Sequence, residues 1–360
     1  MNNFFEKISI YMTLLSKYKY IWGKKKYLSQ TIWTGEIFNE AIDNAFSRYL
    51  TSSELKDVSL KNKLINDVIY CYYKYDAIPN EYFFLNFRNS SEIIRKNIAT
   101  NKFRDHVMIN QVGLGNEGFE FFKNKYNCYS YLKKYFKRDI CFIKNDVDKN
   151  YFIDFYTKHY SFIVKPLMGL RSIGIHIINR DDYCGSAEEC YQFLKNQGDW
   201  IVEELIEQHN ELSLLNQSSV NTIRIISFLT SKGFNVFKAY MKIGREGDLT
   251  DDVNGEGLNV IIDIKTGKII SDILEHKSNK HYGKHPDNGI TLRDFQIPMW
   301  NELLIFVEEV HRAIPFYYPQ VSWDFALTNS GWVLVEGNWG SLTFRDDDII
   351  KKDEFMSFFD

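Results

Sequence analysis

The sequence of 360 residues has a formal net charge of −3 at pH 7, with 44% hydrophobic and 25% charged residues. These values describe a globular protein large enough for two or three subdomains, and they give no electrostatic reason to expect a nucleic acid partner. Five cysteines without a C-x-x-C pair exclude a zinc ribbon or disulfide framework and favour reduced thiols in the cytoplasm. We expect neither a membrane-spanning helix nor a signal peptide, because charged residues interrupt the apolar stretches.

Residues 1 to about 122 are predicted to be mostly helical. Apolar residues recur at helical spacing in MNNFFEKISIYMTLL and in LKNKLINDVIYCYYKY. Motifs with evident chemistry are sparse here, so we expect this region to shape the choice of acceptor or to serve in docking. For the amphipathic first helix, packing into a core is favoured over peripheral contact with a membrane.

After residue 122 the pattern becomes a mixture of helices and strands, which indicates an α+β fold. A long irregular stretch is expected before Pro298, and a helix is expected to follow it. Helices are predicted at 123–136, 186–197 and 299–314, and strands at 140–143, 161–166, 173–179, 200–206, 222–230, 234–243 and 259–264.

A loop that could cover phosphates follows the strand FIVKP. Lys165 ends this strand, and the loop contains Gly169, Arg171, Ser172 and Gly174. Backbone N–H groups of such a loop can bind phosphate oxygens, and a lysine at its mouth supplies a positive charge. It matches neither the P-loop nor the dinucleotide-binding motif, since a strand rather than a helix follows, and taken alone the stretch favours an ordinary hairpin.

The stretch WIVEELIEQHNEL is an apolar strand that ends in acidic residues. It contains Glu203 and Glu204, followed by Leu205, and a further acid, Glu211, comes seven residues after Glu204. A strand edge with free backbone groups can pair with an adenine, and an acid beyond it can accept from ribose hydroxyls. The alternative is a strand that runs into a polar turn.

Arg224 interrupts the apolar strand TIRIISFLT. Because arginine is seldom buried without a partner, it either pairs with an acid of the core or reaches into a site.

The stretch VSWDFALTNSGWVLVEGNWG predicts a hairpin that brings two carboxylates together. With a three-residue loop ending at Gly331, Thr328 would face Trp332 and Asp324 would lie opposite Glu336. Opposed side chains have Cβ atoms roughly 4.5 to 5.5 Å apart, and two negative charges so close need a neutralising partner.

A divalent cation would meet that need. Asn338 lies on the same face as Glu336, since side chains alternate along a strand, and it can add a carbonyl oxygen. Mg²⁺ prefers such oxygen ligands together with phosphate oxygens. The alternative is an ordinary hairpin whose acids are hydrated at an edge.

Two further groups of residues are of interest. His276, His281 and His285 share one polar stretch. A zinc cluster is conceivable there, although a loop facing the substrate is favoured. Trp323 and Trp339 flank the predicted metal site, where core packing is the favoured role for Trp323 and stacking on a sugar the alternative.

The order of these motifs along the chain resembles the ATP-grasp superfamily, and most closely its sugar-transfer-associated branch. The phrases that carry the resemblance are EQHNELSLLNQSSVNTIRIISF, VNGEGLNVIIDIKTGKI, HPDNGITLRDFQIPMW and VSWDFALTNSGWVLVEGN. The similarity extends from about Tyr126 to Asn338. It implies an ATP-grasp fold in which two α+β lobes grip ATP, with residues 1–122 as a helical N-terminal region, 123–205 as the small lobe and 206–360 as the large lobe.

The resemblance also implies roles for individual residues. The small lobe would cover the phosphates, and the large lobe would hold Mg²⁺, with Arg224 facing the transferred phosphoryl group or the substrate carboxylate. The implied phosphate contacts are Lys125, Lys165 and the loop of Gly169, Arg171, Ser172 and Gly174; the adenine contacts are Glu203, Glu204 and Leu205; the ribose contact is Glu211; and the metal ligands are Asp324, Glu336 and Asn338.

Two departures weaken particular assignments. The loop DDVNGEGLNV lacks paired glycines, which makes Asn254 a less secure site residue. The ribose acid could instead be Glu207, because the EQHNEL turn departs from the usual spacing.

The activity implied by the family is ATP-dependent ligation of a carboxylate to an amine through an acylphosphate. Lys165 and Arg224 would carry the catalysis by positioning and neutralising charge. The expected partners are a small-molecule or saccharide carboxylate and an amine donor in cell-surface polysaccharide biosynthesis (capsule or O-antigen), with peripheral contact to the glycan assembly machinery. The sequence also allows a kinase with a hydroxyl acceptor, or a scaffold that binds nucleotide without turnover.

Overall fold

The computed structural model describes residues 35–110, 116–144, 148–167, 174–183, 185–251, 257–275, 278–340, 342, 345 and 347–359. The chain divides into two compact units, residues 1–96 and 97–360. The division falls before the boundary expected at residue 122, so two helices assigned to the N-terminal region belong to the second unit. The three-part division drawn from the sequence otherwise stays a prediction.

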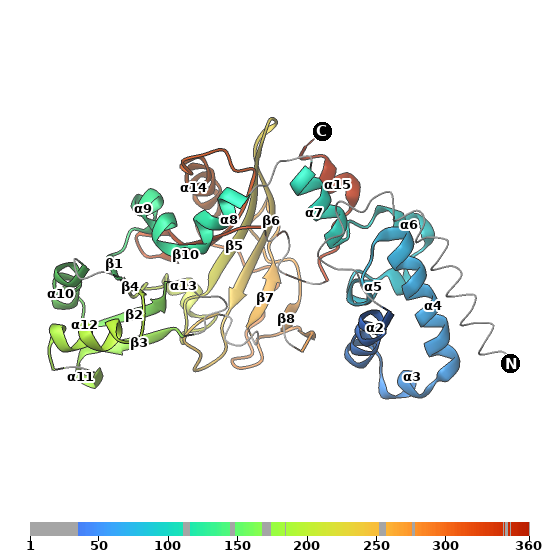
Figure 1. Cartoon of the computed structure of the whole chain (residues 1–360), viewed down its shortest axis with the longest axis horizontal. Helices are drawn as coiled ribbons and strands as arrows, with labels where there is room; N and C mark the ends of the chain where they lie inside the picture. The colour runs from blue at the N-terminus through green and yellow to red at the C-terminus, as the bar shows by residue number, and fades with distance from the viewer. Residues whose placement is uncertain are drawn as a thin grey trace. The chain divides into compact units, whose positions relative to one another are not determined.

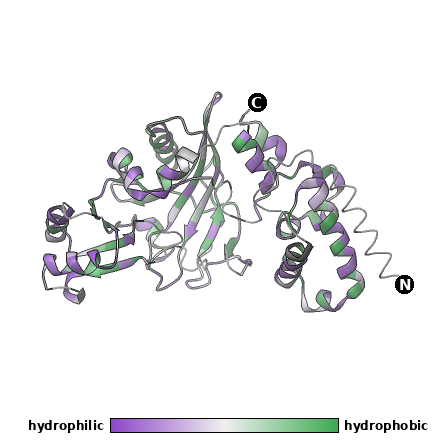
Figure 2. Ribbon diagram, viewed as in Figure 1, coloured by the Kyte–Doolittle hydropathy of each residue, from purple (hydrophilic) through white to green (hydrophobic). Residues whose placement is uncertain are grey.

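The first unit is helical over its described residues (Figure 1). In α4, the longest of its helices, the side chain of Asp57 caps the start by accepting from the Leu60 N–H. Figure 2 shows hydrophilic and hydrophobic residues alternating along these helices, as expected where one side is buried. The helices are α2 (Gly35–Tyr49), α3 (Ser52–Lys56), α4 (Val58–Tyr75), α5 (Pro79–Phe84) and α6 (Glu92–Asn97), with a 3₁₀ turn at Phe87–Asn89.

The second unit begins with α7 (Asn101–Asn110), α8 (Asn116–Lys123) and α9 (Lys125–Phe136). Asn124 caps α9 by accepting from the Tyr126 N–H at 3.0 Å. This cap fixes the helix start, so Lys125 occupies its first turn.

A small antiparallel sheet in the order β1-β4-β2-β3 follows. Helices α10 and α12 pack on it and bury an apolar core, and α11 lies beside them at the left of Figure 1. The strands are β1 (Ile140–Ile143), β2 (Ser161–Pro166), β3 (His176–Asn179) and β4 (Trp200–Glu204), and the helices are α10 (Lys149–Lys158), α11 (Arg180–Tyr183) and α12 (Ala187–Lys195).

A larger antiparallel sheet in the order β11-β10-β5-β6-β7-β8-β9 forms the rest of the unit. Strand β10, which pairs with β11 on one side and with β5 on the other, is buried over nearly its whole length, because helix α14 and apolar side chains cover it. The strands are β5 (Thr222–Thr230), β6 (Gly233–Ile243), β7 (Leu258–Ile261), β8 (Ile273–Glu275), β9 (Lys280–Tyr282), β10 (Gln320–Thr328) and β11 (Gly331–Asn338), and the helices are α13 (Asn210–Ser213), α14 (Trp300–Arg312) and α15 (Lys352–Met356).

The elements predicted after residue 122 are all present, but the sequence missed several short ones. The stretch before Pro298 is not wholly irregular, since it contributes β8 and β9 to the sheet. Three residues suffice for each of these strands, which is too short for an alternating pattern to be visible. Helix α10 was also missed.

The β10–β11 hairpin differs from its predicted form in two ways that compensate. Its loop has two residues, so Thr328 pairs with Gly331 rather than with Trp332. A bulge between Asp324 and Phe325 then shifts the register by one residue. Asp324 therefore does pair with Glu336, although the pairing arises by a different route.

Candidate functional site

The first cluster of the site surrounds Glu203 on β4. Its Oε1 accepts from Lys165 Nζ at 2.9 Å, and its Oε2 accepts from Arg138 Nη2 at 2.5 Å. Glu203 is 3% exposed. Burial would raise its pKa, but the charges of Lys165 and Arg138 outweigh burial and lower it to about 2. Glu203 is thus a buried carboxylate that fixes two cations.

Lys125 lies close enough to this cluster to interact with it electrostatically. Burial lowers the pKa of Lys125, and the positive charge of Lys165 lowers it further. The carboxylates of Glu336 and Glu203 act in the opposite direction. Lys125, at the start of α9, therefore lies near Glu336 of β11, against which α9 packs, and near Lys165 and Glu203 of the small sheet. Arg138 was not expected from the sequence, because nothing local marks it as the partner of a glutamate 65 residues later.

The predicted phosphate loop is described only at its end. Gly169, Arg171 and Ser172 lie outside the described residues, whereas Gly174 has φ +78°. A Cβ at Gly174 would also lie 2.9 Å from Pro166 Cγ, so both the backbone and the neighbouring strand require glycine.

The segment from Glu203 to Leu205 differs from its expected form. β4 has neighbours on both sides, since Glu203 pairs with Ile140 of β1 and with Ile163 of β2. The backbone N–H of Glu204 donates to the Asp139 carbonyl. The free strand edge expected for adenine is therefore absent at Glu203 and Glu204, and only Leu205 lies beyond the end of the strand.

The two candidate ribose acids lie between β4 and β5. Glu211 is exposed in α13, and Glu207 is exposed in the segment before it. Both side chains are open to solvent, so either can reach a ligand, and the choice between them stays a prediction.

The second cluster surrounds Asp324 on β10. Its Oδ1 accepts from Arg224 Nε at 2.8 Å, and its Oδ2 accepts from Arg224 Nη2 at 2.7 Å and from Lys242 Nζ at 3.2 Å. Asp324 is 1% exposed. Burial would raise its pKa, but Arg224 and Lys242 outweigh burial and hold it well below its usual range. Arg224 is thus the partner of a core acid, and its role toward a ligand stays a prediction.

Lys242 and Asp251 also belong to this cluster and were not predicted. Lys242 Nζ lies 3.4 Å from Asp251 Oδ1, and Thr222 Oγ1 donates to the other oxygen of Asp251. Burial would lower the pKa of Lys242, but Asp251 and Asp324 outweigh it and raise the pKa. A lysine within the apolar strand FNVFKAYMKI is the same kind of signal that marked Arg224.

The three predicted metal ligands lie on one face of the hairpin. Asp324 pairs with Glu336, and the Asn338 amide donates to Glu336 Oε1 at 3.2 Å. The carboxylate of Asp324 already accepts three hydrogen bonds from Arg224 and Lys242, and each of its oxygens can accept two. Glu336 and Asn338 are only half-buried. The donor set is all oxygen once the Asn338 carbonyl turns inward, and it fits Mg²⁺.

The histidines, Asn254 and the two tryptophans considered in the sequence analysis have the following positions. His281 lies 3.8 Å from Asp347, His285 is buried, and His276 and Asn254 lie outside the described residues. Trp323 is buried and donates to Ser227 Oγ, as expected for a core residue, whereas Trp339 is exposed. Among the described residues, these histidines form no group of three metal ligands.

Residues 116–343 match the family described as sugar-transfer associated ATP-grasp. The match covers more than half of the chain, and the protein belongs to this family, with an ATP-grasp fold built on two antiparallel sheets and helices and with a helical N-terminal region. A search of curated proteins found no match.

Several solved structures are similar to this chain. N5-carboxyaminoimidazole synthetase from Staphylococcus aureus, complexed with ADP, is 13% identical with a TM-score of 0.37, and the match covers 62% of this chain and 46% of that one. D-alanyl-alanine synthetase A from Vibrio cholerae is 15% identical with a TM-score of 0.38, covering 62% and 57%. L-amino acid ligase from Bacillus licheniformis is 12% identical with a TM-score of 0.37, covering 67% and 46%. The chain thus spans about half the length of these proteins, and similarities of this extent add nothing to the family assignment.

The described helices include none that combines the length and the apolar character needed to cross a lipid bilayer.

Proposed function

We propose that this protein is an ATP-dependent carboxylate–amine ligase. The observation that carries the proposal is the position of Lys125, which interacts electrostatically with Glu336 of the large sheet and with Lys165 and Glu203 of the small sheet. Cations facing a carboxylate pair suit a nucleotide triphosphate with its Mg²⁺, because the lysines bind phosphate oxygens and the acids bind the metal. Family membership supports the same assignment.

In the proposed reaction, an oxygen of the substrate carboxylate attacks the γ-phosphorus of ATP, and ADP leaves. The nitrogen of an amine then attacks the acyl carbon of the acylphosphate, loses a proton, and releases inorganic phosphate as an amide forms. Phosphoryl transfer asks the protein mainly for positioning and neutralisation of charge.

Each part of the site has a role in that chemistry. Glu203 orients Lys165 toward the phosphates, and Asp324 orients Arg224 toward the transferred phosphoryl group or the substrate carboxylate. Asp324, Glu336 and Asn338 would hold Mg²⁺, which supplies positive charge beside the phosphates. The proposed nucleotide contacts further include Gly174, Leu205 and either Glu211 or Glu207.

We place the substrates in cell-surface polysaccharide biosynthesis, because the family is associated with sugar transfer. The carboxylate would belong to a uronic acid or a similar saccharide, and the amine to an amino acid or an amino sugar.

An isotope experiment tests the reaction class. The protein is incubated with Mg-ATP, an amine mixture and uronic acids labelled with ¹⁸O in the carboxylate, and the released phosphate is analysed by mass spectrometry. A ligase transfers one labelled oxygen to phosphate, and only when the amine is present does turnover continue. Lys165→Ala should abolish the transfer, whereas Lys158→Ala, which removes an exposed lysine paired with Asp154, should not.

The other outcomes identify the alternatives. ADP with a stable phosphoester and no free phosphate would mark a kinase acting on a hydroxyl. ATP that binds and is not cleaved with any acceptor would mark a scaffold.

A further inference from the structure

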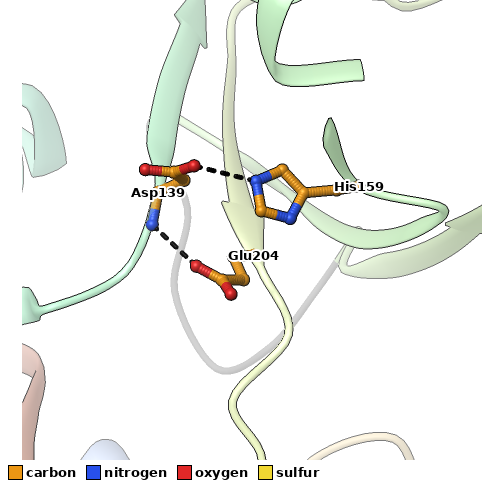
Figure 3. A group of neighbouring side chains, drawn as sticks. All are labelled: Asp139, His159 and Glu204. Atoms are coloured by element: carbon orange, nitrogen blue, oxygen red, sulfur yellow. Dashed lines mark hydrogen bonds and ion pairs between the residues drawn. The ribbon is translucent and has the colours of Figure 1, made fainter. Parts of the chain in front are cut away.

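A second group of ligand-type side chains lies outside the proposed nucleotide site. Asp139, His159 and Glu204 come from three elements: the residue before β1, the residue after α10 and the last residue of β4. Figure 3 shows the three side chains close together, with dashed lines joining Asp139 to both His159 and Glu204. Their ligand atoms all lie within 4.8 Å of one another. Glu204 and Glu203 are neighbours in a strand and point to opposite faces, which keeps this group apart from the Lys165 cluster.

Hydrogen bonds hold the group in place. His159 Nε2 lies 3.0 Å from Asp139 Oδ2, and the Asp139 backbone N–H donates to Glu204 Oε2 at 3.0 Å. The ring of His159 also packs on Phe155 with a centroid distance of 4.4 Å, and its side chain is only 14% exposed. The imidazole is therefore oriented before any ligand arrives.

The spacing fits a metal ion. Two ligand atoms that each lie about 2.1 Å from a metal are separated by about 3.0 Å at a right angle and about 3.4 Å at a tetrahedral angle. The 3.0 Å between His159 Nε2 and Asp139 Oδ2 is the length of their hydrogen bond and equals the right-angle separation, so a tetrahedral ion would move the two atoms apart by about 0.4 Å. A plain ion pair would need only these two residues, whereas Glu204 supplies a second carboxylate that a small side-chain rotation would bring to the same ion.

The donor set selects the kind of metal. One imidazole and two carboxylates suit zinc and neighbouring transition metals, while Mg²⁺ prefers oxygen alone. Zinc with three protein ligands keeps a fourth position open.

The surroundings indicate what takes the open position. The three residues line a hollow of about 620 Å³, together with Lys133, Lys134, Lys137 and Arg138. Glu203 neutralises Arg138, so three lysines remain against two carboxylates. A bare divalent cation is disfavoured in such a positive hollow, whereas a cation bound together with an oxyanion is not.

We propose that Asp139, His159 and Glu204 form a transition-metal site, best fitted by zinc, whose open position faces the lysine-lined hollow and binds an oxyanion. The site is independent of the proposed ligase function.

Zinc titration of the full chain by calorimetry tests the proposal. The titration is done without nucleotide and in excess Mg²⁺, which occupies the proposed magnesium site of Asp324, Glu336 and Asn338 and so keeps zinc from binding there. The wild type should bind one more zinc than His159→Ala, and Glu204→Gln should weaken that site by at least about tenfold. His281→Ala is the matched control, because His281 also faces an aspartate but lacks a third ligand among the described residues. Far-ultraviolet circular dichroism confirms that each variant is folded.

Two further results complete the test. Sulfate should tighten zinc binding in the wild type and not in a Lys133→Gln, Lys137→Gln double variant; equal tightening in both would overturn the oxyanion part.

Equal zinc stoichiometry and affinity in the wild type and His159→Ala would overturn the metal site itself. So would an unchanged zinc affinity in Glu204→Gln, or the absence of saturable zinc binding in the wild type. Loss of nucleotide binding would affect the proposed function and leave this result untouched.

Discussion

The small sheet and the large sheet each bury one carboxylate between two cations, but the charges around the two carboxylates differ. Glu203 lies between Lys165 and Arg138, and Lys125 adds a third positive charge nearby.

Around Asp324, in contrast, two cations meet two further acids. Arg224 and Lys242 pair with Asp324, while Asp251 and Glu336 lie close by. The small-sheet side is therefore positive and the large-sheet side negative. This difference lets one site accept phosphate groups on one side and a metal ion on the other.

The largest expected effect comes from Asp324→Asn. The change leaves Arg224 and Lys242 buried without their main counter-charge, and we expect a loss of about 3–5 kcal/mol in the free energy of unfolding. Urea unfolding measures it. Asp272→Asn, which breaks an exposed pair with Arg293, should cost less than about 1 kcal/mol. Equal losses in the two variants would contradict the buried network.

Glu203→Gln should cost somewhat less, about 3 kcal/mol. Of the two partners of Glu203, Lys165 is 17% exposed and can turn toward water, and the deeply buried Arg138 keeps its hydrogen bond to the Leu334 carbonyl. The same urea measurement compares the two variants. A greater loss for Glu203→Gln than for Asp324→Asn would invert the comparison.

The pH dependence of stability sharpens the role of Glu203. Its pKa is about 2 in the folded protein against an ordinary value of 4.5, so its contribution is present above about pH 4.5 and is lost as pH falls toward 2. By about pH 3 the wild type should have lost about 2 kcal/mol more than Glu203→Gln. Urea unfolding from neutral to acid pH checks this, and parallel curves for the two proteins would rule it out.

The smallest effect is expected at Gly337, which lies between Glu336 and Asn338. A Cβ there would lie 2.6 Å from Phe122 and 2.9 Å from Trp323. Gly337→Ala should therefore cost about 1–2 kcal/mol by overpacking and should displace the metal ligands. Gly283→Ala, where a Cβ meets nothing within 4 Å, should stay within about 0.5 kcal/mol. Unchanged stability and Mg²⁺ affinity in Gly337→Ala would contradict this prediction, because they would show that the hairpin accommodates the added methyl group.

The sequence predicted the elements well where apolar runs are long and bounded. β5 begins and ends at the predicted residues, because the run TIRIISFLT is flanked by polar residues on both sides. The pairing of Asp324 with Glu336 was correct only because a shorter loop and an unexpected bulge compensate. A bulge has no reliable local signal, so the route to this pairing could not be foreseen.

The partners of the buried carboxylates were harder to predict. Arg138 and Lys242 reach Glu203 and Asp324 through strand pairing between distant segments. Local patterns carry no information on such pairs. Neither does the sequence indicate that β1 pairs with β4 and binds the Glu204 N–H, and the adenine contact of residues 203–205 stays a prediction.

The most direct test of the proposed site is the thermal stability of the wild type and of Glu336→Gln with ATP alone, Mg²⁺ alone and both together. A ligand that binds only the folded state raises its stability by mass action. Glu302→Gln, which changes an exposed acid of α14, is the control. The account predicts a clear upward shift for the wild type and Glu302→Gln with Mg-ATP, and a small or absent shift for Glu336→Gln. No shift in folded wild-type protein at saturating Mg-ATP, or an equal shift in Glu336→Gln, would contradict it.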